Sequence, residues 1–215
     1  EDTSRVLTKA NQALQTLQRY KAVFDEKLAT LNEYEFNDIV SLENVITAIQ
    51  RAELVMKVGK MVQRQIYELG TEGRLIEMQL EEIIGNLEEE ELLIIKDYMV
   101  QEKKENEILD KIASLDQEQL LDTGYIAKIL GYENFDNYDE VGVYTKGYRV
   151  LNKIPRMPNN IVENLIKTFK SFQHILIADI PELDSVEGIG EIRARTIKQS
   201  LRRMQEQFVF DRMLI

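Results

Sequence analysis

The sequence contains no cysteine and no tryptophan, and only one histidine among its 215 residues. Without cysteine, the chain can form neither a disulfide bond nor a thiolate zinc site, and it has no cysteine nucleophile. A single histidine excludes any site that needs two imidazole groups. No apolar run approaches the roughly 20 residues of a membrane-spanning helix, and the first residues do not resemble a signal peptide. We therefore expect a cytoplasmic protein without membrane contacts.

Proline and net positive charge are also scarce, and both are concentrated at one end of the chain. All three prolines fall within residues 141–215, and this segment carries 12 basic and 8 acidic residues, a net charge of +4. The whole chain has a net charge of −11, so the remaining 140 residues carry a net charge of −15. An acidic body with a basic end suggests that the end contacts an anion. We predict two modules, 1–140 and 141–215, joined near residues 133–147.

The first module is expected to be helical throughout. Apolar residues recur every three or four positions over residues 6–31 and again over residues 42–69, as in long amphipathic helices. Ser41 is the expected N-cap of the second stretch and Gly70 its expected end. Further helices are predicted over residues 75–84, from Asn86 onward, and over residues 108–115 and 125–130. No segment alternates with a period of two, so the prediction is an all-α fold that begins with a long-helix spine or bundle.

The densest run of one charge is Glu-Glu-Glu-Glu at residues 88–91. One interpretation is a site for a metal ion or a basic partner. The other is a solvated first helical turn, where glutamates meet the positive end of the helix dipole, with Asn86 and Glu89 as a capping pair. We favour the second, because a hard cation needs ligands that converge from several directions. No metal site is expected.

Tyrosines are concentrated in residues 124–148, which hold five of the nine together with four glycines. Such a segment could serve as a platform on which bases stack. We favour a connector whose rings pack against both modules, because Asp136, Asp139 and Glu140 would repel phosphates.

The most informative segment is residues 183–197, where Gly-Ile-Gly separates two helical patterns with the spacing of a helix-hairpin-helix. Glycines admit backbone conformations barred to other residues and let the main chain approach a ligand closely. The following helix opens with unpaired amides and the positive end of its dipole facing outward. We expect the turn to bind a phosphate without reading a base, with Ile189 anchored in the core. The turn residues are Gly188, Ile189, Gly190 and Glu191.

Basic residues on the helix after this turn would add charge to the same site. A purely structural helix-turn-helix corner is the alternative, but apolar residues occupy the positions that the hairpin core requires. The basic residues concerned are Arg193, Arg195, Lys198, Arg202 and Arg203.

A degenerate second copy of the hairpin precedes the first. Residues 154–158 align with the Gly-Ile-Gly turn so that Met157 matches Ile189, Pro158 matches Gly190, and Arg156 replaces the first glycine. Tandem hairpins of this kind can straddle the minor groove, one hairpin to each strand. Since proline donates no amide, we expect Lys153 and Arg156 to supply side-chain charge instead.

Four runs in the sequence resemble a bacterial family of DNA integrity scanning proteins, which are diadenylate cyclases. They are residues 148–158 and 186–195 in the hairpins and residues 7–17 and 68–73 in the spine. The resemblance implies a separate cyclase domain that makes cyclic di-AMP from two ATP with magnesium. It also implies a helical linker, a helix-hairpin-helix domain that binds branched DNA and thereby suppresses synthesis, an octamer formed through the cyclase domains, and a place at the nucleoid.

The two sequence motifs of the cyclase are absent from this chain. It contains no Asp-Gly pair, and its one histidine, His174, lies in Gln-His-Ile rather than Arg-His-Arg. Because the chain also starts at Glu1 rather than methionine, we expect a fragment without a catalytic residue or a cofactor of its own. The predicted function is structure-specific DNA binding. The alternatives are a helical scaffold that only spaces its parent, or a repair glycosylase in which Asp211 follows the hairpin.

Overall fold

The computed structural model describes residues 2–100 and 103–214, and every regular element within these residues is a helix. The prediction of an all-α fold is therefore confirmed. None of the described helices is both long enough and apolar enough to cross a membrane.

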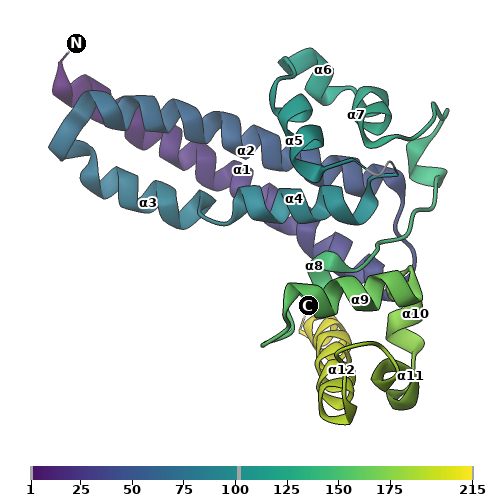
Figure 1. The fold of residues 1–215 in the computed structure, drawn as a ribbon. Coiled ribbons are helices and arrows are strands. Elements are labelled where there is room, and N and C mark those ends of the chain that lie inside the picture. Colours follow the sequence, from purple (N-terminus) through teal and green to yellow (C-terminus); the bar gives the residue numbers. More distant parts are fainter. Residues whose placement is uncertain (1, 101–102, 215) are drawn as a thin grey trace.

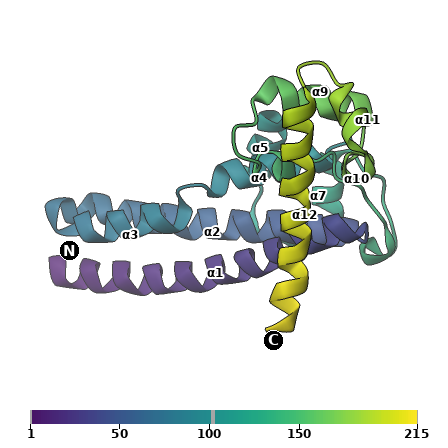
Figure 2. The ribbon, with the colours of Figure 1, turned by 90° about the horizontal axis from the view of Figure 1, so that it is seen from below.

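The spine consists of long helices that lie alongside one another (Figure 1). The first two form an antiparallel hairpin, and the chain then returns along it as two shorter helices (Figure 2). Their apolar stripes face inward and bury two adjoining clusters of aliphatic side chains. The elements are α1 (Thr3–Asn37), α2 (Leu42–Leu69), the 3-10 segment η1 (Gly70–Gly73), α3 (Arg74–Ile84) and α4 (Leu87–Tyr98).

The ends of α2 follow the sequence signals. The amide of Asn44 donates to the Ser41 hydroxyl (3.2 Å), and the Ser41 amide donates to the Asn44 side chain (2.9 Å), which completes a capping box. Gly70 ends the helix at a φ of 61°, in the left-handed region that glycine favours. Asn86 does precede α4, but its side chain makes no capping hydrogen bond, so the predicted capping pair with Glu89 is wrong.

A cluster of short helices packs against α2 and α4 at the end of the spine away from residue 2 (Figure 1). The helix α6 was not expected from periodicity, although Asp116 and Gln119 form a capping box that marks its start. After these helices the chain passes the start of α2, where the Leu42 amide donates to the Val141 carbonyl (2.8 Å). The elements are α5 (Glu105–Ala113), α6 (Gln117–Leu121), α7 (Thr123–Leu130) and the 3-10 segment η2 (Tyr138–Glu140).

The tyrosines of this connecting segment support its interpretation as a connector. The Tyr132 hydroxyl donates to the Tyr98 carbonyl of the spine (2.6 Å), while Tyr148 packs on the hydrophobic core of the second module. The ammonium of Lys96 lies 4.2 Å from the centre of the Tyr148 ring, which ties α4 to that module. Tyr144 is exposed.

The second module contains the two hairpins. Its core runs from Val150 to Leu201, and the spine contributes Phe36 to it. The helices are α8 (Tyr148–Leu151), α9 (Asn159–Phe169), α10 (Phe172–Ile177), α11 (Ile180–Asp184) and α12 (Glu191–Met213). The division at residue 140 stays a prediction, because the two modules share contacts at this junction.

The junction between the modules is a buried network centred on Arg149. The guanidinium of this fully buried residue donates to the Glu35 carboxylate (2.5 Å) and to Asn32, and the Tyr98 hydroxyl donates to the other Glu35 oxygen (2.5 Å). Beside it, the buried Asp97 carboxylate accepts backbone amides at the start of α8, at 2.7 Å from Tyr148. Burial and the nearby Glu35 raise the pKa of Asp97 to about 7, although Arg149 opposes the shift. The network fixes α8 against α1 and α4.

Glu91 does not belong to a solvated helical turn, which corrects the expectation for residues 88–91. Glu88 and Glu89 are exposed, but Glu91 is only 1% exposed and lies beside the buried Glu53 of α2. Four consecutive residues span a full helical turn, so one of them must face the bundle. Burial and then the hydrogen-bonded Glu53 carboxyl raise the pKa of Glu91 well above its ordinary value. No described cluster of acidic residues is arranged to hold a metal ion.

Replacing Glu91 with glutamine is expected to stabilise the protein at neutral pH. A carboxyl whose pKa is raised by folding contributes its stability below the unfolded pKa, and this contribution is lost as the pH rises through the folded pKa. Glu91→Gln keeps a hydrogen-bond donor for Glu53 without the charge, so its advantage over the unchanged chain should grow as pH rises above about 4.5 and reach on the order of 1 kcal/mol. Urea unfolding at a series of pH values measures this difference in the free energy of unfolding between the two proteins.

The matched control is Glu89→Gln, because Glu89 is exposed on the same helix. It should change the free energy of unfolding by less than about 0.5 kcal/mol at every pH. Equal pH slopes for Glu91→Gln and the unchanged chain would contradict the assignment.

Candidate nucleic-acid interface

The two hairpins repeat each other at a constant offset of 32 residues. Leu151 and Leu183 lie in the last turns of the first helices, α8 and α11, and the amides of Ile154 and Val186 donate to these leucines' carbonyls at 3.1 Å in both turns. Val162 and Ala194 are buried at equivalent positions on the second helices. These matches are consistent with the alignment of the degenerate copy with the glycine copy.

The backbone supplies a further match that sequence alone could not establish. Arg156 and Gly188 occupy the same turn position, and both have positive φ angles, 58° and 85°. A residue with a Cβ rarely adopts this conformation, which costs about 1–2 kcal/mol outside glycine. The arginine side chain is thus retained at a position that backbone conformation alone would assign to glycine.

The two glycines of the second hairpin have different roles. Gly188 needs its positive φ, and a Cβ there would lie 2.6 Å from the Ile161 side chain. Gly190 has φ −100° and ψ 179°, an extended conformation that any residue adopts, so the expectation of an unusual backbone at both glycines is wrong for Gly190. A Cβ on Gly190 would meet nothing within 4 Å. Neither the fold nor its neighbours require glycine there, and its lack of a side chain leaves the backbone open to a ligand.

The turn that presents Gly190 is held in place from several sides. Ile189 is buried in the core, as expected, and its amide donates to the Val186 carbonyl (3.0 Å). The Asn164 amide group of the first hairpin donates to the Glu187 carbonyl (2.9 Å), and the Arg193 guanidinium donates to the Gly188 carbonyl (2.9 Å). The site is therefore preorganised before any ligand arrives.

Backbone amides at the start of α12 face outward from this turn. The first helical hydrogen bond of α12 runs from the Ala194 amide to the Gly190 carbonyl (2.9 Å), so the amides of residues 191–193 precede it and have no partner within the helix. No side chain caps this end. With the dipole of a 23-residue helix behind them, these amides suit an anion such as phosphate.

The first hairpin is poorer in amides but has charge at the same place. Pro158 stands at the N-cap of α9 and has no N–H group to donate. Arg156 and Lys153 are exposed in its turn, where their side chains can supply positive charge. Although Lys153 remains exposed, nearby protein atoms remove part of its hydration, and this effect and then the Arg149 charge lower its pKa.

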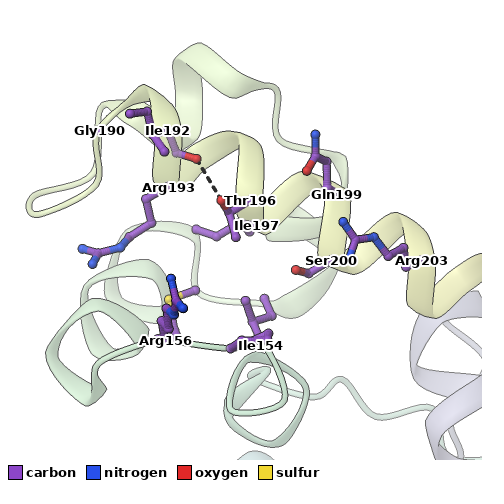
Figure 3. A pocket seen from close by; sticks show the side chains of 12 residues that line it. Ile154, Arg156, Gly190, Ile192, Arg193, Thr196, Ile197, Gln199, Ser200 and Arg203 are labelled. Atoms are coloured by element: carbon purple, nitrogen blue, oxygen red, sulfur yellow. Dashed lines mark hydrogen bonds between the residues drawn. The ribbon is translucent and has the colours of Figure 1, made fainter.

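A groove of about 640 Å³ lies between the first turn and the outer face of α12. Figure 3 shows Ile154 and Arg156 on one side and α12, with Arg193 and Arg203, on the other. Of the residues predicted for the site, the structure brings Arg156, Gly190, Arg193 and Arg203 to this groove, and no carboxylate lines it. The lining residues are Ile154, Pro155, Arg156, Met157, Gly190, Ile192, Arg193, Thr196, Ile197, Gln199, Ser200 and Arg203.

The other predicted basic residues lie outside the groove. Arg195 is exposed and forms an ion pair with Glu191 (2.9 Å). Lys198 donates to the Leu176 carbonyl (3.2 Å) and so ties α12 to α10, while Arg202 is exposed on another face of α12. Sequence reasoning missed Ile192 and Thr196, although residues 192, 196, 199 and 203 have the 4-3-4 spacing of one helical face.

The residues considered for catalysis are not arranged for it. Asp211 is exposed, accepts a hydrogen bond from the Gln207 amide group (2.8 Å) and does not line the groove. His174 is exposed, with its Nδ1 atom 2.9 Å from the Phe169 carbonyl oxygen. Neither residue lines the groove.

The sequence is similar to those of one family of known proteins. The family described as "DisA bacterial checkpoint controller linker region" matches residues 1–138. The chain is 45% identical over 212 residues to the DNA integrity scanning protein DisA of Clostridioides difficile strain 630, covering 99% of this chain and 60% of that protein. Its namesake in Carboxydothermus hydrogenoformans is 48% identical over 208 residues, covering 96% and 59% respectively. The chain spans about 60% of the length of these relatives. With more than half of its residues matched by the linker family, the chain belongs to the DisA family.

Proposed function

We propose that residues 141–215 bind DNA through its phosphate backbone and that the protein recognises branched DNA without reading base sequence. The observation that carries this proposal is Gly190, a glycine that neither conformation nor packing requires, at the open amide end of a long helix. Backbone amides and arginines bind phosphates of any sequence, so they position DNA but do not identify its bases.

The paired hairpins support contact with two strands. Gly190 in one turn and Arg156 in the other both border a single groove, and the turns share the same backbone conformation. A branched DNA presents several backbones at once, so a site with two separated phosphate contacts gains more from it than from one duplex arm. The acidic spine would stay away from DNA and serve as a rigid support.

For the protein as a whole we propose the activity that its family resemblance implies. The relatives carry the name DNA integrity scanning protein. The proposed reaction is synthesis of cyclic di-AMP from two ATP with magnesium, carried out by a domain outside this chain and suppressed when the hairpins hold branched DNA. Assembly as an octamer through that domain and association with the nucleoid belong to the same proposal. The chain itself is proposed to have no cyclase activity.

The test is a titration of this chain against a duplex and a four-way junction at two salt concentrations. We expect salt-sensitive binding, tighter to the junction and independent of sequence, because each phosphate contact releases counterions. Failure to bind either DNA would leave the scaffold interpretation. Base release from a damaged duplex would instead favour the glycosylase interpretation.

Reversing the charge of Arg193 is expected to weaken binding to all sequences about equally. Loss of one phosphate contact should also reduce the slope of log affinity against log salt by about one. Arg195→Glu is the matched comparison, because Arg195 is exposed two residues further on, outside the groove. It should change the slope by less, and equal effects of the two changes would indicate a diffuse basic patch.

A further inference from the structure

The groove between the hairpins has features that a phosphate contact alone does not require. Part of its accessible lining is apolar: Pro155 is exposed, Met157 is half-buried, and Ile192 stands on α12 with 85% of its surface exposed. An exposed isoleucine beside a charged site gains nothing from water or from phosphate. A ligand with an apolar face would cover it.

We propose that this groove accepts one unpaired nucleotide of the bound DNA, with the base against the apolar lining and its phosphates at the surrounding arginines. The inference rests on the proposed function and adds the feature that the site recognises. A base within a duplex has both faces stacked on its neighbours, whereas an unpaired base at a branch can leave the stack at a smaller free-energy cost.

The charge around the groove matches such a ligand. Arg156 and Arg193 lie toward one end and Arg203 toward the other (Figure 3), and no carboxylate lines the groove. The three guanidiniums could therefore contact phosphates on either side of the nucleotide. Gly190 also borders the groove, so the amides proposed to hold a phosphate are next to the space proposed for the base.

Polar groups within the groove fit the edge of a base. Gln199 and Ser200 line it from α12 and can both donate and accept hydrogen bonds. Such groups suit any of the four bases, so the site would detect an unpaired nucleotide without selecting its sequence. Apolar side chains next to basic ones are also how many proteins hold an unstacked DNA step.

The experiment compares two duplexes of equal length, one fully paired and one with a single unpaired 2-aminopurine nucleotide. The unchanged chain should bind the second DNA more tightly, and the fluorescence of the 2-aminopurine should change on binding. In Ile192→Gln, the affinity for the DNA with the unpaired nucleotide is expected to fall about tenfold, which corresponds to about 1.4 kcal/mol. Its affinity for the paired duplex and its salt dependence should stay the same, because no phosphate contact is removed.

Ile177→Gln is the matched control. Ile177 is 74% exposed on α10 and does not line the groove, so its replacement should leave both affinities unchanged. Equal binding of both DNAs by the unchanged chain, or a preference that survives in Ile192→Gln, would overturn this inference and leave phosphate binding intact. Absence of binding to both DNAs would overturn the proposed function as well.

Discussion

Gly190→Asp is expected to bind junction DNA about 10- to 100-fold more weakly than the unchanged chain while remaining as stable or becoming more stable. The weaker binding corresponds to loss of one charge-assisted contact. Aspartate at this position is a better N-cap than glycine, since its carboxylate can accept the amides at the start of α12. The same carboxylate would occupy the place proposed for the phosphate and repel it. Thermal unfolding and a junction titration measure the two effects separately.

The neighbouring glycine provides the contrasting control. Gly188→Ala places a Cβ at a φ of 85° and 2.6 Å from the Ile161 side chain, so it should lower the stability by about 2 kcal/mol. Gly190→Ser, which adds a small side chain without charge, should weaken binding less than Gly190→Asp does. If Gly190→Asp binds the junction as the unchanged chain does, the turn is not where the phosphate is held.

Arg149→Met is expected to destabilise the protein by about 3–5 kcal/mol, the largest effect that we predict for a single substitution. Removing the guanidinium leaves the Glu35 and Asp97 carboxylates buried without the positive charge that faces them. Denaturant unfolding measures the loss. Because the network joins α8 to α1 and α4, a separate unfolding transition of the hairpin module should also become visible.

Two comparisons isolate the buried charge. Adding Glu35→Gln to Arg149→Met should recover part of the stability, since glutamine carries no charge and can still accept the Tyr98 hydroxyl. Arg195→Met removes an exposed ion pair with Glu191 and should cost less than about 0.5 kcal/mol. If Arg149→Met lowered the free energy of unfolding by no more than is expected for Arg195→Met, the network would contribute little to stability.

The fold could largely be predicted because its helices rely on local signals. Heptad-like spacing marks α1 and α2, and Ser41 and Gly70 mark the ends of α2. The buried carboxyl pair and the Arg149 network could not be predicted in this way. In the sequence, Glu91 is one of four consecutive glutamates and Arg149 is one of the basic residues of the second module. Only the packing of α2 on Glu91 and of α1 on Arg149 shows that both side chains are buried beside carboxylates.

The sequence predicts the two hairpin turns of the candidate site but not which residues line the groove between them. The Gly-Ile-Gly spacing predicts the second hairpin, and alignment of residues 154–158 with that turn predicts the degenerate copy. Which basic residues share one face depends on how the hairpins pack. Arg156 and Arg203 come from segments 47 residues apart yet line one groove, whereas Lys198 turns toward α10. Ile192 carries no sequence signal other than its helical register with Thr196 and Arg203.

The helix α12 joins the proposed phosphate site to the spine without a break. It begins at Glu191, directly after Gly190, and the last turns of its 23 residues lie against α1 (Figure 2). There Arg212 pairs with Glu33 (2.7 Å), and the Phe208 ring packs on Phe36 at 5.3 Å. A rod of this length, ~34 Å, moves its far end by ~3 Å when it tilts by about 5°. The helix has the geometry of a lever arm, so a small rotation imposed at its first turn would become a displacement of side-chain size at α1.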